Sequence, residues 1–355
     1  MRTRLSSCFI QGNSQDLQRD TKGGLLFLRL DSCLSVSGTR NEDWPDPCEV
    51  KRNKGKETSE MSYSVVPNSA NPMAILFVVD QSGSMSEKMQ NGKTKAEQVA
   101  TVINKTISEL VIRSSRGDMV KNYYEVGVIG YSGKGVCNAL GGAFAKSILN
   151  PITLFEQNPL RIEDRITEIV TDAGDIVQQP VKFPVWFEPM AYGGTPMCSA
   201  LKAAAVTIAP WCDSHSKKDE PNDPGPFPPV IIHITDGESG DGDPLQIAEL
   251  LRKLSVKDGN VLMCNLHVST ERGAAIYFPA SDLELPNAYA KNLFNMSSVI
   301  PSEMMANIRE ELRGKTELSD GARFFTFNGD EVAIVKFIRI GTQGTLPRLT
   351  YAGER

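Results

Sequence analysis

Residues 74–84 read AILFVVDQSGS, an apolar run that ends in a carboxylate and two hydroxyls. Six consecutive apolar residues followed by a polar loop predict a buried strand. Asp80, Ser82 and Ser84 then lie where this strand passes into a loop, the edge at which open α/β sheets bind ligands. Taken alone, the same three residues would also suit a simple turn that caps a strand.

Two later loops carry side chains of the same kind. A Gly-Gly-Thr-Pro turn occupies residues 193–196, and the apolar run Val230–Ile234 is followed by Thr235-Asp236-Gly237-Glu238. Each loop also has a structural interpretation, because Thr195 before Pro196 suits a helix N-cap and Asp236-Gly237 is an ordinary turn dipeptide. The three loops together offer two carboxylates and three hydroxyls, the hard oxygen donors that suit Mg²⁺ or Mn²⁺: Asp80, Ser82, Ser84, Thr195 and Asp236.

With these five positions filled, the chain resembles the von Willebrand factor A (vWA) domain. The metal-ion-dependent adhesion site (MIDAS) of that family has the pattern DxSxS, then a distant Thr and a distant Asp, and the resemblance covers residues 71–341 in element order. It implies that the strand ending at Asp80 lies beside the one ending at Asp236. It also implies that both serines and either Thr195 or Asp236 contact the metal, that the remaining carboxylates act through water, and that an Asp or Glu of a partner protein takes the open position.

The rest of the chain alternates between strand-like and helix-like patterns. This alternation predicts an α/β fold, a doubly wound and mostly parallel sheet with helices on both faces and one antiparallel edge strand. Asp243 is expected to cap the helix at 245–254, with Pro244 in its first position. The other expected elements are helices at 96–110, 201–208, 287–294, 302–312 and 331–340, strands at 123–131, 230–234, 261–268 and 324–327, and a hairpin or edge strand within 147–192.

The domain boundaries follow from composition. Residues 1–60 contain one apolar cluster and no periodicity, so we expect a disordered or untranslated extension with the true start at Met61. Residues 61–72 are a leader, 73–341 the vWA domain, and 342–355 a tail. Two insertions are expected in the domain, at 147–192 and at 213–229, the second a polar, proline-rich surface loop.

Composition excludes several classes of partner. The net charge is −5, with no basic stripe to track phosphates, so nucleic acid is not expected. No stretch approaches the ~20 apolar residues that span a bilayer. The seven cysteines include no CxxC pair, which favours reduced thiols and a cytoplasmic setting. The vWA resemblance is to the intracellular bacterial type of the family.

Other motifs fail at defined positions. The acidic loop at 236–243 has Asp241 where a calcium loop requires glycine, and its carboxylates at Glu238, Asp241 and Asp243 suit a solvated rim and a helix cap. Two of the three histidines lie in apolar strands, which favours structural roles, so no enzyme is expected. Three functions remain open: a metal-dependent protein-interaction module; a regulatory or adaptor subunit for an AAA+ ATPase or a kinase-phosphatase system related to tellurite resistance; and a metal-dependent hydrolase.

Overall fold

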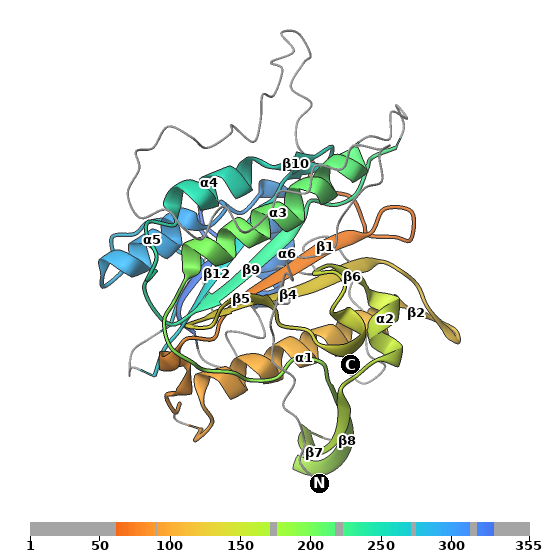
Figure 1. Ribbon diagram of the computed structural model, residues 1–355. Coiled ribbons are helices and arrows are strands. Elements are labelled where there is room, and N and C mark those ends of the chain that lie inside the picture. Colours follow the sequence, from red (N-terminus) through yellow and green to blue (C-terminus); the bar gives the residue numbers. More distant parts are fainter. Residues whose placement is uncertain are drawn as a thin grey trace, which may run out of the picture. The chain divides into compact units, whose positions relative to one another are not determined.

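The computed structural model describes residues 62–89, 91–170, 176–216, 223–270, 275–312 and 318–329 (Figure 1). The expected N-terminal extension, the start at Met61, the closing helix at 331–340 and the tail lie outside the described residues.

Within the described ranges, an eight-stranded sheet forms the centre of the domain. In spatial order its strands are β13 (Ile276–Tyr277), β14 (Phe325–Gly329), β12 (Leu262–Val268), β9 (Val230–Thr235), β1 (Met73–Asp80), β4 (Tyr124–Ser132) and β5 (Gly135–Asn138), while β6 (Asn150–Pro151) pairs with β4. The five central strands, from β14 to β4, are parallel, whereas β5, β6 and β13 run antiparallel to their neighbours. The predicted mostly parallel α/β sheet with an antiparallel edge strand is thus confirmed.

Helices cover both faces of this sheet. On one face lie α1 (Lys95–Ser114), α2 (Ile152–Gln157) and α6 (Ser302–Leu312). On the other lie α3 (Met197–Ser216), α4 (Leu245–Lys253) and α5 (Ala288–Met296). Short 3₁₀ turns occur at η2 (Gly83–Ser86) and η3 (Gly142–Phe144). Every expected helix within the described residues is present, so the alternating pattern predicted the double winding.

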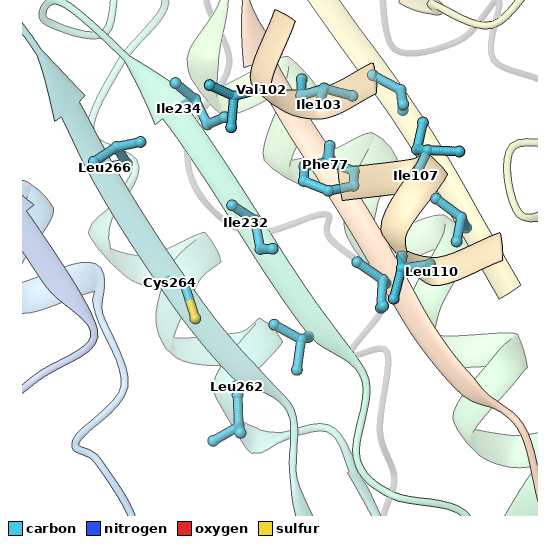
Figure 2. Close-up of a cluster of buried hydrophobic side chains, with 14 of the residues drawn as sticks. Phe77, Val102, Ile103, Ile107, Leu110, Ile232, Ile234, Leu262, Cys264 and Leu266 are labelled. Carbon is cyan, nitrogen blue, oxygen red and sulfur yellow. The ribbon is translucent and has the colours of Figure 1, made fainter. Parts of the chain in front are cut away.

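The apolar run that opens the sheet is buried on both sides because its side chains alternate between two cores. Ile75 and Phe77 pack in the cluster that includes α1, and Leu76 and Val78 pack in the cluster that includes α3. Figure 2 shows Phe77 among side chains of α1 and of neighbouring strands. A strand covered on both faces has no polar alternation, which is why this run is continuously apolar.

The segment 147–192 contains a hairpin, one of the two forms expected. β7 (Arg161–Val170) and β8 (Ile176–Val185) pair antiparallel as a separate two-stranded sheet. Two smaller hairpins join β2 (Ser115–Arg116) to β3 (Met119–Val120) and β10 (Ser255–Val256) to β11 (Gly259–Asn260).

Two local expectations were wrong. The expected surface loop at 213–229 is shorter, because α3 continues to Ser216 and residues 225–229 are buried, with Phe227 in the core against the edge of Tyr63. Helix α4 begins at Leu245, one position after Pro244. Asp243 still accepts a hydrogen bond from the Leu245 amide at 3.0 Å, so it serves the first turn as expected.

Replacing Phe77 by alanine should lower the free energy of unfolding by about 3–5 kcal/mol, because the fully buried ring leaves a cavity between β1 and α1. Urea unfolding followed by circular dichroism measures the change. Leu283→Ala is the control, since that side chain is 84% exposed and should change stability by less than about 0.5 kcal/mol. Equal effects of the two substitutions would contradict this description of the core.

Candidate metal centre

The candidate site lies where the strand order reverses. β1 pairs in parallel with β4 on one side and with β9 on the other, and Val79 stands opposite Ile234. The residues that follow this pair, Asp80 and Thr235, therefore lie at the same edge of the sheet. The expected adjacency of the two strands is confirmed, and this edge is where doubly wound sheets bind ligands.

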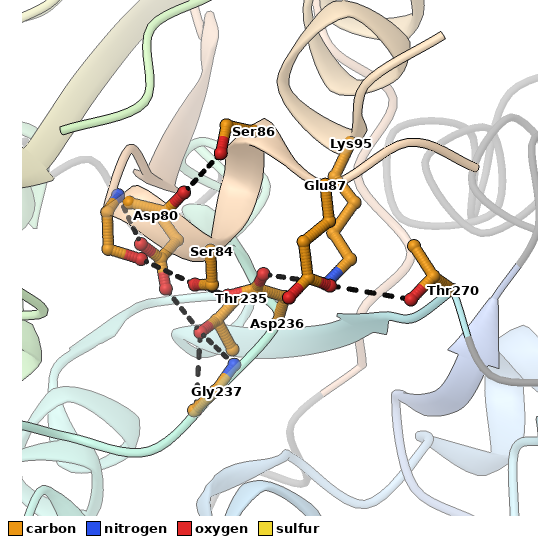
Figure 3. Close-up of polar contacts among 11 residues, drawn as sticks. Asp80, Ser84, Ser86, Glu87, Lys95, Thr235, Asp236, Gly237 and Thr270 are labelled. Carbon is orange, nitrogen blue, oxygen red and sulfur yellow. Dashed lines mark hydrogen bonds and ion pairs between the residues drawn. The ribbon is translucent and has the colours of Figure 1, made fainter. Parts of the chain in front are cut away.

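The Asp80 loop is organised around its carboxylate. Asp80 Oδ1 accepts a hydrogen bond from the Ser82 amide at 2.8 Å, and Oδ2 accepts one from Thr235 Oγ1 at 2.7 Å. The hydroxyls of Ser82 and Ser84 lie 3.0 Å apart, and Ser84 Oγ donates to Asp236 Oδ1 at 2.8 Å (Figure 3). Four of the five predicted residues thus form one continuous hydrogen-bonded group.

The turn that precedes Thr195 reaches the same edge through backbone contacts, and the Gly240 amide donates to Thr195 O at 2.8 Å. The Gly83 amide donates to Gly193 O at 2.8 Å, and the Tyr192 amide donates to Gln81 O at 2.7 Å. A Cβ on Gly133 would lie 2.8 Å from the Cα of Gly193, so this close approach requires glycine. The turn before Thr195 is therefore fastened to the loop that carries Ser82 and Ser84.

The N-cap role considered for Thr195 belongs to another residue. Asp241 Oδ1 accepts from the Cys198 amide at 2.8 Å, and Oδ2 accepts from the Ser199 amide at 2.9 Å. These amides lie in the first turn of α3, so Asp241 caps that helix from a distant loop. Glu238, in the same acidic loop, is exposed as expected of a solvated rim.

Lys95 is a part of the site that the sequence motifs did not reveal. Its Nζ donates to Asp236 Oδ2 at 2.9 Å and to Glu87 Oε2 at 2.7 Å (Figure 3). The Lys95 side chain is 6% exposed and that of Asp236 is fully buried, whereas Glu87 is 55% exposed. Burial acts to lower the pKa of Lys95, but the bonds and charges of Glu87 and Asp236 outweigh it and raise the pKa, so Lys95 is a cation.

Burial also shapes the protonation of Asp80. It raises the pKa of this carboxyl above its usual range, the charge of Asp236 adds to the rise, and the hydrogen bonds from Ser82 and Thr235 oppose it. A cation beside Asp80 would counter this cost, since it favours the ionised form.

A buried polar chain continues behind the site. Asn265 Nδ2 donates to Ser297 Oγ at 2.9 Å, so its Oδ1 accepts from His233 Nδ1 at 2.8 Å. His233 Nε2 then accepts from the Tyr131 hydroxyl at 2.8 Å. Burial lowers the pKa of His233 to about 4, so the ring is neutral and structural, as its place in an apolar strand predicted.

The donor set fits a hard divalent cation. Adjacent oxygens around Mg²⁺ lie about 2.9 Å apart when each is about 2.1 Å from the ion, and the hydroxyls of Ser82 and Ser84 lie 3.0 Å apart. Among the described residues, no three His, Cys, Asp or Glu side chains group so as to hold a metal. A site at this edge therefore depends on its hydroxyls.

Neither a family model nor a curated protein matches this chain. Similar solved structures include proximal thread matrix protein 1 from the mussel byssus, with 14% identity, a TM-score of 0.35, and coverage of 78% of this chain and 47% of that one. The pilus adhesin SpaC from Lactobacillus rhamnosus GG shows 13% identity, a TM-score of 0.39, and coverage of 77% and 30%. The vWF domain of the type V pili tip protein Mfa5 from Porphyromonas gingivalis shows 13%, 0.23, and 48% and 39%. The matched region spans less than half of each of these three chains.

Within the described part of the chain, no helix combines the length and apolar character that crossing a bilayer requires. Cys198, Cys212 and Cys264 are free thiols. The cytoplasmic setting expected from the cysteines stays a prediction.

Stability should fall as the pH drops from about 6.5 toward 4. His233 is neutral in the folded protein, with a pKa of about 4, and takes up a proton near pH 6.5 when unfolded, so its contribution is complete above that range and lost below it. The loss attributable to His233 is on the order of 3 kcal/mol. Urea unfolding between pH 7.5 and 4.5 measures it. His233→Gln should flatten the slope and leave the part due to His267, whose pKa burial also lowers to about 4; an unchanged slope would contradict the assignment.

Gly133→Ala should lower the free energy of unfolding by about 1–3 kcal/mol, because its Cβ would meet the backbone of the 193–194 turn at 2.8 Å. The Gly83 and Tyr192 amides, which tie the two loops together, should exchange hydrogen faster. Gly141→Ala is the matched control, since a Cβ there meets nothing within 4 Å. Slow exchange at both amides in Gly133→Ala would refute the close approach.

Proposed function

We propose that this chain is a vWA-type protein-interaction module that binds Mg²⁺ or Mn²⁺ and, through it, an Asp or Glu of a partner protein. The observation that carries the proposal is the meeting of Asp80, Ser82, Ser84 and Asp236 at the carboxyl ends of β1 and β9. Thr195, on the turn fastened to the same loop, completes the set that the resemblance assigns.

Ser82 and Ser84 are the residues best placed to hold the ion directly. Their hydroxyls are neighbours, and both carry lone pairs that no backbone amide occupies in the bonds described above. Asp80 accepts hydrogen bonds through both carboxylate oxygens, which suits a ligand that acts through water. Bound there, the ion would supply a strong positive charge with coordination positions left for water or an outside carboxylate.

Neutral hydroxyl ligands favour binding of an acidic partner. They leave most of the charge on a divalent ion uncompensated, so the ion attracts a carboxylate strongly. Catalysis is not part of the proposal, since His233 and His267 are buried and neutral and His215 stacks on Trp211 on another part of the fold. An adaptor role beside an ATPase or a kinase would use the same binding event, so the identity of the partner decides between the two.

Ser84→Ala and Asp80→Asn should each weaken Mn²⁺ binding about tenfold or more. Ser84→Ala removes an oxygen donor, and Asp80→Asn removes a negative charge at the site. Electron paramagnetic resonance of free Mn²⁺ measures the affinity. Glu238→Gln is the control, since it removes the same charge as Asp80→Asn from an exposed position in the neighbouring loop. Equal affinity in all four proteins would rule out this site.

A second experiment tests binding of a partner, with residues 1–355 as bait in native lysate. A partner retained with Mg²⁺ but lost with EDTA or with Ser84→Ala would support a metal-dependent interaction. Partners bound equally in every condition would contradict it. Hydrolysis of a model phosphoester that needs Mn²⁺ and is lost in Ser84→Ala would favour the hydrolase instead.

A further inference from the structure

The strongest unexplained feature of the site is a cation that belongs to the protein itself. Lys95 is nearly buried, at 6% side-chain exposure, and bonds directly to the fully buried carboxylate of Asp236. Burying a lysine is costly unless it is paired, and a lysine at the first position of a helix also opposes the helix dipole. Such a residue needs its acidic partners in order to stay there.

The two oxygens of Asp236 face different groups. Oδ1 accepts from Ser84, on the side of the metal-binding hydroxyls, and Oδ2 accepts from Lys95, on the side of α1. Lys95 also bonds to Glu87, which follows the loop that carries Ser82 and Ser84, so the position of the ammonium group is fixed from two sides. The carboxylate is thereby held between a hydroxyl and an ammonium group.

We propose, on the basis of the proposed function, that Lys95 is a built-in competitor of the divalent ion for Asp236. Lys95 keeps this carboxylate in the outer coordination shell of the ion and lowers the affinity for the metal. It also leaves the metal-loaded site one charge unit more positive than a neutral residue at position 95 would. The site therefore binds the metal less tightly, and the bound metal attracts a partner's carboxylate more strongly.

The direction of this charge effect is the same for any position of the ion within the site. Replacing Lys95 by a neutral side chain makes the site more negative by one unit close to Asp236, whatever the other charges contribute. A divalent ion then binds more tightly, and an outside carboxylate binds the loaded site more weakly. The arrangement also predicts a change in coordination, because a released Asp236 can replace a water on the ion.

The test compares Lys95→Met with Lys93→Met, a control that removes the same charge from an exposed position two residues before Lys95. We expect Lys95→Met to tighten Mn²⁺ binding about ten- to hundredfold and Lys93→Met to change it less than about threefold. Water-proton relaxation of bound Mn²⁺ should show about one fewer exchangeable water in Lys95→Met. Broadening of ¹³C-acetate by the bound ion should show about tenfold weaker carboxylate binding.

The outcomes separate the two proposals. If the wild type binds Mn²⁺ and Lys95→Met has the same affinity and water number, the role of Lys95 is overturned while the metal site stands. If neither protein binds Mn²⁺, both proposals fail. If Lys95→Met does not fold, the exposed Glu87→Gln decides, because it frees Lys95 to bond to Asp236 alone. Mn²⁺ binding weaker than in Glu238→Gln, which removes the same charge, supports the inference, and equal binding in these two variants overturns it.

Discussion

The parallel pairing of β1 with β9, buried on both faces, is the constraint on which the site depends. Because both strands are held in register between two layers of helices, the side chains that follow them emerge at the same edge. Asp80 and Asp236 are 156 positions apart in the sequence numbering, and only this pairing brings them into one hydrogen-bonded group. The apolar core thus determines the geometry of a polar site to which it contributes no side chain.

Two buried carboxylates this close require compensation, and the protein supplies it in two ways. Asp80 receives neutral donors, an amide and a hydroxyl, whereas Asp236 receives a hydroxyl and the ammonium group of Lys95. Neutral donors leave the negative charge of Asp80 available to a cation. The charged donor, Lys95, offsets the negative charge of Asp236, so the two acidic residues of the motif are not equivalent.

Sequence reasoning predicted the sheet and the helices because these follow from local patterns of apolar residues, whereas the adjacency of the two strands was an implication of the vWA resemblance. It did not reveal Lys95, since nothing in the spacing of a lysine at the start of a helix shows which carboxylate it will meet. It also gave Thr195 a possible capping role that belongs to Asp241, which reaches α3 from 42 and 43 residues away. Phe227 was misjudged because prolines around it favoured a surface loop, while its aromatic ring is buried in the core.

A chain of buried, hydrogen-bonded polar side chains lies behind the site and joins neighbouring strands of the sheet. Tyr131 lies close enough to Asp80 for that charge to contribute, after burial, to raising the pKa of the tyrosine. Tyr131 bonds to His233, and the chain continues through Asn265 to Ser297, which donates to a carbonyl of α5 at 2.8 Å. Each of these side chains has its partner, so the chain fixes one arrangement instead of leaving buried groups unpaired. The turn before Thr195 is held instead by backbone bonds, from the Gly83 amide to Gly193 O and from the Tyr192 amide to Gln81 O. Side-chain bonds thus hold one part of the site to the core, and backbone bonds hold the other part to the Ser82–Ser84 loop.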